Sequence, residues 1–231
     1  MRIAENIEML KLGGELPIYL TLAWDESNFV LIDTGMPDQT KDIERAVSEL
    51  GYFFGRCAKD LTHIIITHQD MDHIGCVKDL LKIAPNAKIL AHADEAPYMD
   101  GSKIPVKLAA ALEEYDNETE EEKGYIDEFK QDYEELYFKT DQELKDGDVL
   151  PICGGIEIVH TPGHTPGHIC LYFQKSKIMV LGDAASVENG ELVSFNPIYI
   201  HNIDLANQSI EKLKTYDTKG VVGYHSGYFP M

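Results

Sequence analysis

The apolar residues of this chain recur with two spacings, which alternate along its length. Short runs rich in β-branched residues predict strands, whereas apolar positions three or four residues apart predict the buried faces of helices. The clearest helical repeat of the first half puts Ile43, Val47 and Leu50 on one face and stops at Gly51. Strands are expected over residues 17–23, 28–35, 61–68, 87–95, 146–163, 168–174, 177–183 and 220–229. Helices are expected over residues 36–52, 72–86 and 203–217, the last with Leu205, Ile210 and Leu213 as core contacts.

The two halves of the chain resemble each other loosely. In each half an apolar strand runs into a histidine-rich turn, over residues 64–75 in the first and 156–170 in the second. This arrangement predicts an α/β (α+β) fold in which two β-rich halves pack sheet on sheet, with helices outside. We expect the 231 residues to form a single domain, 1–231.

Residues 97–140 interrupt the alternation with a polar, strongly acidic stretch. Residues 113–135 hold 12 acidic and 2 basic residues, a net −10 that is half of the formal charge of −20. Such a run is typical of a solvated helix face, and a lid or a partner surface is the alternative. We expect a helical insertion that overhangs the mouth of the site. Its aromatic residues can wall an apolar pocket, meet a second subunit or pack on their own domain: Tyr98, Tyr115, Tyr125, Phe129, Tyr133, Tyr137 and Phe138.

The composition restricts the partners and the compartment. A formal charge of −20 repels nucleic acid and anionic membranes. No apolar run approaches the roughly 18 residues that a membrane helix needs, and the N-terminus does not resemble a signal peptide. The four cysteines lack CxxC spacing, which favours reduced thiols. We therefore expect a cytoplasmic protein with a small-molecule substrate, no nucleic-acid or membrane partner, and a homodimer as the assembly to consider.

Residues 67–75, THQDMDHIG, carry the strongest chemical signal. Four ligand-type side chains occur within six positions at a strand-to-helix junction: His68, Asp70, Asp72 and His73. Alternate residues of an extended segment point the same way, so His68 and Asp70 can face one metal ion. Asp72 and His73 are neighbours whose side chains diverge, so they can serve a second ion nearby. Gly75 leaves room for backbone to pass close to the site.

Three later segments add ligand-type residues where apolar strands end. The turn TPGHTPGH is stiffened by proline and glycine and presents His164, with His168 as a hydrogen-bond partner. Another strand ends at Asp183, whose two oxygens can each bind a cation, and the last strand brings His225. Strand ends are the usual place for ligand sites in layered folds.

The ordered set of these motifs resembles the metallo-β-lactamase superfamily, and the overall look is closest to its N-acyl homoserine lactone lactonases. The segments that match are DTG at 33–35, HxxxDH at 68–73, TPGHTPGH at 161–168, GD at 182–183 and the late His225. The resemblance implies a four-layered αββα sandwich that binds two divalent metal ions, zinc, manganese or iron, along one edge of its sheets.

The resemblance also implies a role for each candidate ligand. The first metal ion would be held by His68, Asp70 and His164. The second would be held by Asp72, His73 and His225, with Asp183 between the two ions. Asp33 matches a motif residue that supports the ligands without binding metal. A metal-bridging hydroxide would be the nucleophile, with Asp72 as the catalytic residue that orients it and accepts its proton.

This chain departs from the family pattern HxHxDH at Asp70. A third carboxylate beside Asp72, Asp183 and a hydroxide brings the negative charge to −4 against the +4 of two divalent ions. Carboxylate oxygen suits harder ions such as Mn²⁺ or Fe²⁺ better than imidazole-rich sites do. The departure also raises a rival in which only the second position holds a metal ion.

Substrate contacts are expected from three further residues, Ser186, Tyr199 and His201. Ser186 stands where the lactonases have a tyrosine, so Tyr199 or Tyr224 is the candidate to replace that tyrosine. His201 lies on a loop that can reach the substrate. The sequence thus predicts a metal-dependent hydrolase of a small ester, lactone or thioester. Two alternatives stay open: an iron-dependent redox protein of the flavodiiron or persulfide dioxygenase kind, and a non-catalytic binding module.

Overall fold

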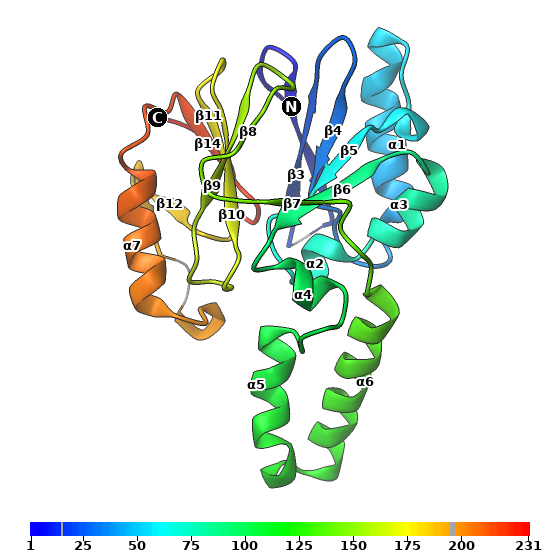
Figure 1. Cartoon of the computed structure of the whole chain (residues 1–231), viewed down its shortest axis with the longest axis vertical. Coiled ribbons are helices and arrows are strands. Elements are labelled where there is room, and N and C mark those ends of the chain that lie inside the picture. The colour runs from blue at the N-terminus through cyan, green and yellow to red at the C-terminus, as the bar shows by residue number, and fades with distance from the viewer. Residues whose placement is uncertain (15, 195–196) are drawn as a thin grey trace.

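The computed structural model describes residues 1–14, 16–194 and 197–231. Two β-sheets face each other at its centre, and helices cover the outer face of each sheet (Figure 1). Helices α1 (Thr40–Gly51) and α3 (Val77–Ile83) cover one sheet, and α7 (Ile203–Leu213) covers the other. The four-layered αββα sandwich predicted from the sequence is confirmed.

The first sheet has seven strands in the order of the chain. Strands β1 to β4 are antiparallel, whereas β4 to β7 are parallel. The change follows from the connections, because parallel neighbours need a crossover and helices supply it. The strands are β1 (Arg2–Ala4), β2 (Ile7–Leu12), β3 (Ile18–Trp24), β4 (Phe29–Ile32), β5 (His63–Ile65), β6 (Lys88–His92) and β7 (Gln142–Leu144).

The second sheet has the order β15-β14-β11-β10-β9-β8. All its pairs are antiparallel except β11 with β14, which are joined through α7 and are parallel. A separate hairpin lies between β11 and α7. The strands are β8 (Val149–Leu150), β9 (Ile156–His160), β10 (Ile169–Phe173), β11 (Ile178–Gly182), β14 (Gly220–Gly223) and β15 (Gly227–Pro230), with β12 (Ser186–Glu188) and β13 (Glu191–Val193) in the hairpin.

Alternation along the strands divides the core into three apolar layers. On β4, Leu31 packs in the layer under α1 and α3, while Val30 and Ile32 point into the layer between the sheets. A third layer joins the second sheet to α7 through Ile210 and Leu213. Because successive strand residues point to opposite faces, a strand that is buried on both faces must be apolar throughout, as β4 is.

The structure corrects three details of the predicted elements. The N-terminal segment forms β1 and β2, which the sequence did not predict. The helix expected over 72–86 is split into α2 (Met71–Ile74) and α3, and it ends before Pro85. On α7, Leu205 is 37% exposed, so its expected role as a core contact is wrong, and Ala206 and Ser209 are buried in the face instead.

Residues 96–136 include three helices, of which α5 and α6 project from the body of the molecule (Figure 1). Helix α6 begins at a capping box, in which Thr119 and Glu122 satisfy each other's backbone N–H groups. Tyr133, near the C-terminal end of α6, is buried in the core, whereas Tyr125 is 63% exposed. The helices are α4 (Ala96–Met99), α5 (Val106–Glu114) and α6 (Glu120–Leu136), and the short 3₁₀ turns of the chain are η1 (Tyr52–Phe54), η2 (Ala58–Asp60), η3 (Tyr115–Asn117) and η4 (Pro197–Tyr199).

Candidate metal centre

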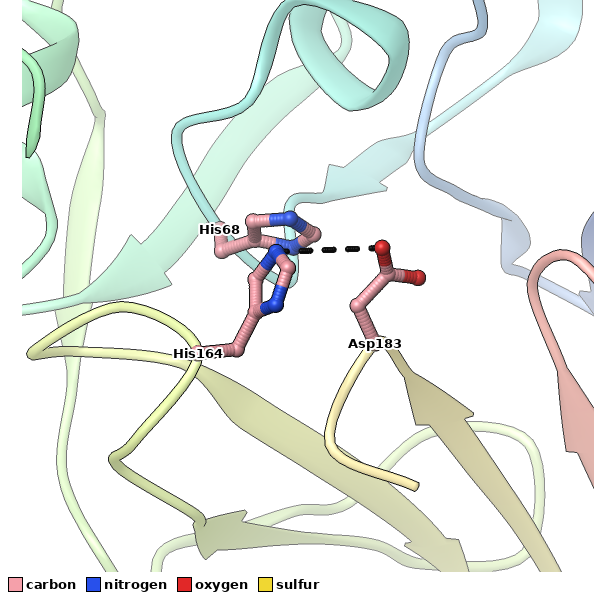
Figure 2. Close-up of side chains that lie close together, drawn as sticks. All are labelled: His68, His164 and Asp183. Atoms are coloured by element: carbon pink, nitrogen blue, oxygen red, sulfur yellow. Dashed lines mark ion pairs between the residues drawn. The ribbon is translucent and has the colours of Figure 1, made fainter. Parts of the chain in front are cut away.

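The seven predicted ligands gather where four strands end at one edge of the two sheets. They follow β5 and β14 and lie on the turns after β9 and β11, so both halves of the chain contribute. Figure 2 shows the imidazoles of His68 and His164 directed toward the carboxylate of Asp183. Donor atoms of these three residues lie within 4.8 Å of one another.

The first set of donors has the spacing that a small cation requires. The Asp70 Oδ2 atom lies 3.2 Å from His68 Nε2 and 2.8 Å from His164 Nε2. His164 Nε2 lies 3.8 Å from Asp183 Oδ2. Ligands about 2.1 Å from a tetrahedral ion are separated by about 3.4 Å, so these distances fit one ion.

The second set is equally compact. Donor atoms of Asp72, His73 and His225 lie within 4.8 Å of one another. His225 Nε2 is 3.3 Å from oxygens of both Asp72 and Asp183, and His73 Nε2 is 3.6 Å from both carboxylates. Asp183 therefore contacts both sets, which is the position required of a carboxylate shared between two ions.

A buried hydrogen-bond chain orients two of the imidazoles. Asp33 Oδ2 lies 2.9 Å from His73 Nδ1, and Thr67 donates its hydroxyl proton to the same carboxylate. Since a carboxylate only accepts, His73 must carry its proton on Nδ1. The Thr67 oxygen then accepts from His68 Nδ1 at 3.0 Å. His68, whose ring is neutral, therefore presents an unprotonated Nε2 to the cavity. For His73, burial is outweighed by Asp72, Asp33 and Asp183, which raise its pKa well above the usual value, so its Nε2 must give up a proton before it can bind metal.

The backbone of Asp183 is held in place by His168. The Nε2 atom of His168 accepts a hydrogen bond from the Asp183 backbone N–H at 3.0 Å, and its Nδ1 lies 2.8 Å from the Thr161 hydroxyl. Burial, together with the nearby His68 and His164, lowers the pKa of His168 well below its usual value, so the ring is neutral. His168 is thus the hydrogen-bond partner that the sequence predicted, not a ligand.

The charges of the cluster favour cations. Burial opposes the ionisation of Asp70 and Asp183, but neighbouring histidines outweigh it and hold both pKa values well below normal. Burial and the nearby His73 lower the pKa of His68 to about 4, which keeps its ring neutral. For His225, burial is outweighed by two carboxylates that raise its pKa to about 9.

Several buried nitrogen and oxygen atoms of this cluster that could bind metal lack the hydrogen bonds that buried polar atoms normally make. Within the described part of the chain, these are Nε2 of His68 and His73 and Oδ1 of Asp70 and Asp183. Buried polar atoms are almost always satisfied in proteins. Imidazole nitrogens and carboxylate oxygens that converge in this state fit divalent metal ions.

A fully buried carboxyl, which the sequence analysis missed, joins the two ligand loops. Glu95 accepts hydrogen bonds from the backbone and side chain of Gln69, both at 2.9 Å, and from the backbone N–H of Gly167 at 2.7 Å. Gln69 lies between two ligands, and Gly167 follows His164 in the TPGHTPGH turn. Burial raises the pKa of Glu95 to about 7. A single glutamate after an apolar strand carries no signal of this role.

Lys107 is a second functional residue that the sequence did not reveal. Its ammonium lies 2.5 Å from Asp70 Oδ2, and its Nζ lies 5.5 Å from the centre of the Tyr199 ring. Lys107 comes from α5, within the acidic insertion, where a lone lysine gives no reason to expect a site contact. The contact could not be read from the sequence, because Lys107 and Asp70 are 37 positions apart.

Cavities open over the two ligand sets. One of about 380 Å³ is lined by Leu16, Asp72, Lys107, His164, Asp183, Tyr199 and His225. A second, of about 520 Å³, is lined mainly by apolar side chains, among them Met71, Phe129 and Tyr133. These volumes are in the range of small-molecule sites.

Of the residues predicted to contact substrate, some line a cavity at the metal site and others do not. Tyr199 lines the 380 Å³ cavity, and His201 lines a neighbouring one of about 280 Å³ beside His164. Ser186 begins β12 and is not among the residues that line these three cavities in the described part of the chain. Tyr224 donates to the Asp72 backbone carbonyl and packs its ring against His73, so it supports a ligand from behind.

Another His/Asp group lies outside this cluster. Donor atoms of His92, Asp94 and His160 lie within 4.8 Å of one another. The two imidazole rings are stacked, with centroids 4.1 Å apart and planes 10° apart. Stacked rings direct their in-plane lone pairs side by side, so they do not converge on one ion.

Comparisons with known proteins agree with this geometry. Residues 13–225 match the family model described as metallo-beta-lactamase superfamily. An N-acyl homoserine lactonase from a Bacillus species is 27% identical over 208 residues, covering 87% of this chain and 76% of the relative. A hydroxyacylglutathione hydrolase from Francisella tularensis subsp. novicida is 26% identical over 173 residues, covering 74% of this chain and 49% of the relative.

Further sequence relatives and solved structures are similar to this chain. The uncharacterized protein YobT of Bacillus subtilis is 29% identical over 178 residues, covering 77% of this chain and 66% of YobT, so the chain spans about half to two thirds of these first relatives. A metallo-beta-lactamase family protein from Thermus thermophilus superposes with a TM-score of 0.74 at 20% identity, covering 98% of this chain and 75% of that one. The di-iron-bound form of TTHA1623 superposes with a TM-score of 0.63 at 20% identity, covering 96% and 94%. Among the described residues, no helix is long and apolar enough to span a bilayer.

Proposed function

Since the chain belongs to the metallo-beta-lactamase superfamily, as its motifs predicted, we propose that it is a metal-dependent hydrolase of a small ester, lactone or thioester. One observation carries the proposal. Two sets of His and Asp donors, each with the spacing of a small cation's ligands, share Asp183 beneath a cavity of small-molecule size. Divalent ions bound there would make hydroxide available near neutral pH and polarise the acyl oxygen.

The protein's own groups would do the rest of the work. Asp72 is the candidate catalytic residue, because its side chain is 27% exposed and lines both cavities while it pairs with His73 and His225. It is placed to orient a water molecule and to accept its proton. Asp33 and Thr67 keep the Nδ1 protons of His73 and His68 in place, so that Nε2 of each faces the metal position.

The substrate class is argued from the cavity and from the relatives. The wall of Met71, Phe129 and Tyr133 suits an acyl chain. Lys107 and Tyr199 line the smaller cavity together with the candidate ligands. Two of the relatives are named as a lactonase and as a hydroxyacylglutathione hydrolase, and both names describe hydrolysis at an acyl group. A small-molecule substrate and a homodimer, without nucleic acid or membrane, remain predictions from the sequence.

A redox function with iron is the second candidate. The carboxylate Asp70 enriches the site in oxygen ligands, which iron and manganese accept readily, and one structural neighbour is described in a di-iron-bound form. Metal analysis of protein purified without added metal identifies the ion, and oxygen consumption with an added electron donor then separates the two candidates.

The decisive experiment restores the metal found by that analysis and assays lactones, esters, thioesters and phosphodiesters. We expect hydrolysis in one of the three acyl classes and a loss of about 100-fold or more in Asp72→Asn, as for other removed general bases. The exposed Asp132→Asn is the matched control and should behave as wild type. A metal-loaded protein that hydrolyses none of the acyl substrates, or consumes oxygen with an added electron donor instead, would refute the proposal.

A further inference from the structure

The two metal positions differ in one respect that the ligand types alone do not reveal. At the first position, a single carboxylate oxygen, Asp70 Oδ2, is shared by three partners. It lies 3.2 Å from His68 Nε2, 2.8 Å from His164 Nε2 and 2.5 Å from Lys107 Nζ. A full positive charge of the protein therefore already sits on this ligand.

Lys107 is held in this place by the same loop that carries the ligands. The neighbouring Val106 donates its backbone N–H to the side-chain oxygen of Gln69 at 2.7 Å, at the start of α5. Gln69 is in turn bound to the buried Glu95. The Lys107 ammonium also lies over the face of Tyr199. Its position is thus built into the site and is not that of a free surface lysine.

At the second position, no lysine or arginine among the described residues forms an ion pair with the carboxylates of Asp72 and Asp183. In the described part of the chain, the ion-pair partners of Asp72 are His73 and His225, both of them candidate ligands. An ion that binds there meets carboxylates whose ion-pair partners are themselves candidate ligands. An ion that binds at the first position meets the Lys107 ammonium on Asp70, which is the carboxylate that this position does not share with the second.

We infer that the two positions bind metal unequally, with the first made weaker by the Lys107 ammonium held on Asp70. This inference rests on the proposed metal-dependent function, but it concerns binding and is tested without substrate. A cation of +2 charge and an ammonium on one carboxylate repel each other strongly inside a protein. We expect the first position to bind about tenfold or more weakly than the second, since tenfold corresponds to only about 1.4 kcal/mol.

Lys107 changes the net charge that Asp70 adds to the site. A carboxylate in place of the family's histidine adds a negative charge, and Lys107 cancels it. The pair of Asp70 and Lys107 thus has the charge of the neutral histidine that it replaces, while leaving the ligand partly occupied. The core keeps the net charge of a two-metal centre, at the expense of affinity for the first ion.

The test is a titration of the metal-free full-length protein with Mn²⁺, in which free ion is measured by electron paramagnetic resonance and bound ion by elemental analysis. Wild type should show one tight and one weaker ion per chain. Lys107→Met, of similar length without charge, should strengthen the weaker ion by about tenfold or more and leave the tight ion unchanged. Lys107→Arg keeps the charge and should keep the separation, and Lys103→Met in the same segment is the matched control.

Two ligand variants assign the ions to positions. His225→Ala should abolish the tight ion, whereas His164→Ala should retain it and lose the weaker one. Two ions of equal affinity in wild type, or an unchanged separation in Lys107→Met, would overturn the inference. Equal loss of the separation in Lys107→Met and Lys107→Arg would show that the size of the side chain, not its charge, is responsible, and would overturn it too. Each of these results is independent of whether any substrate is hydrolysed.

Discussion

Replacing Glu95 with glutamine tests whether this buried carboxyl joins the two ligand loops. The side chain is fully buried and accepts three N–H groups, two from Gln69 on one oxygen and one from Gly167 on the other. A glutamine of the same shape has only one accepting oxygen. Its amide group must face at least one of these donors, and that N–H is left buried without an acceptor.

The structure sets the size of the effect and its dependence on pH. One unsatisfied buried donor costs about 1–3 kcal/mol, so Glu95→Gln should lower the free energy of unfolding by that amount at pH 6. The pKa of about 7 in the folded protein is above the ordinary 4.5. Wild type therefore loses stability from this group as the pH rises from about 4.5 to about 7, by up to about 3 kcal/mol in all. Glutamine cannot titrate, so the deficit of the variant should shrink between pH 5 and pH 8.

Urea denaturation of metal-free protein at several pH values measures both effects. The difference between wild type and variant isolates this group, because all other titrating groups are common to both. Glu44→Gln on the exposed face of α1 is the matched control and should change the free energy of unfolding by less than about 0.5 kcal/mol. Equal stability of Glu95→Gln and wild type at pH 6, or a difference that does not vary with pH, would refute the reasoning.

Three further predictions concern the same edge of the sheets. Gly75→Ala places a Cβ atom 2.6 Å from the carbonyl oxygen of Gly35, so it should lower the free energy of unfolding by about 1–3 kcal/mol in urea denaturation; unchanged stability would mean that these loops separate freely. Asp33→Asn removes the acceptor that fixes the tautomer of His73, and metal affinity measured by equilibrium dialysis should fall by about 10–100-fold, whereas wild-type affinity would exclude that role. Metal binding should release a proton from His225, whose pKa is raised to about 9, so affinity should rise with pH up to that value. Calorimetry in buffers of different ionisation enthalpy measures the release, and identical heats at pH 7 would contradict it.

The local chemistry of the site followed from the sequence because its ligands are clustered along the chain. His68, Asp70, Asp72 and His73 lie within six residues at the end of an apolar strand, so their proximity needs no tertiary information. The later ligands each follow another apolar strand. The loose resemblance of the two halves predicted two packed sheets with helices outside, and the three apolar layers of the core agree with that arrangement.

Contacts between segments distant in sequence were decided by the tertiary structure alone. Lys107 reaches Asp70 across 37 residues and Glu95 reaches Gly167 across 72, and neither distance leaves a periodic trace in the sequence. Leu205 has the apolar character of a core residue, yet the orientation of α7 on the second sheet turns it outward. Hydrophobic periodicity reports which face of an element is buried, because it depends on backbone geometry that every element of that type shares. Which charged residue meets which depends on how loops and helices pack, and only the folded chain determines that.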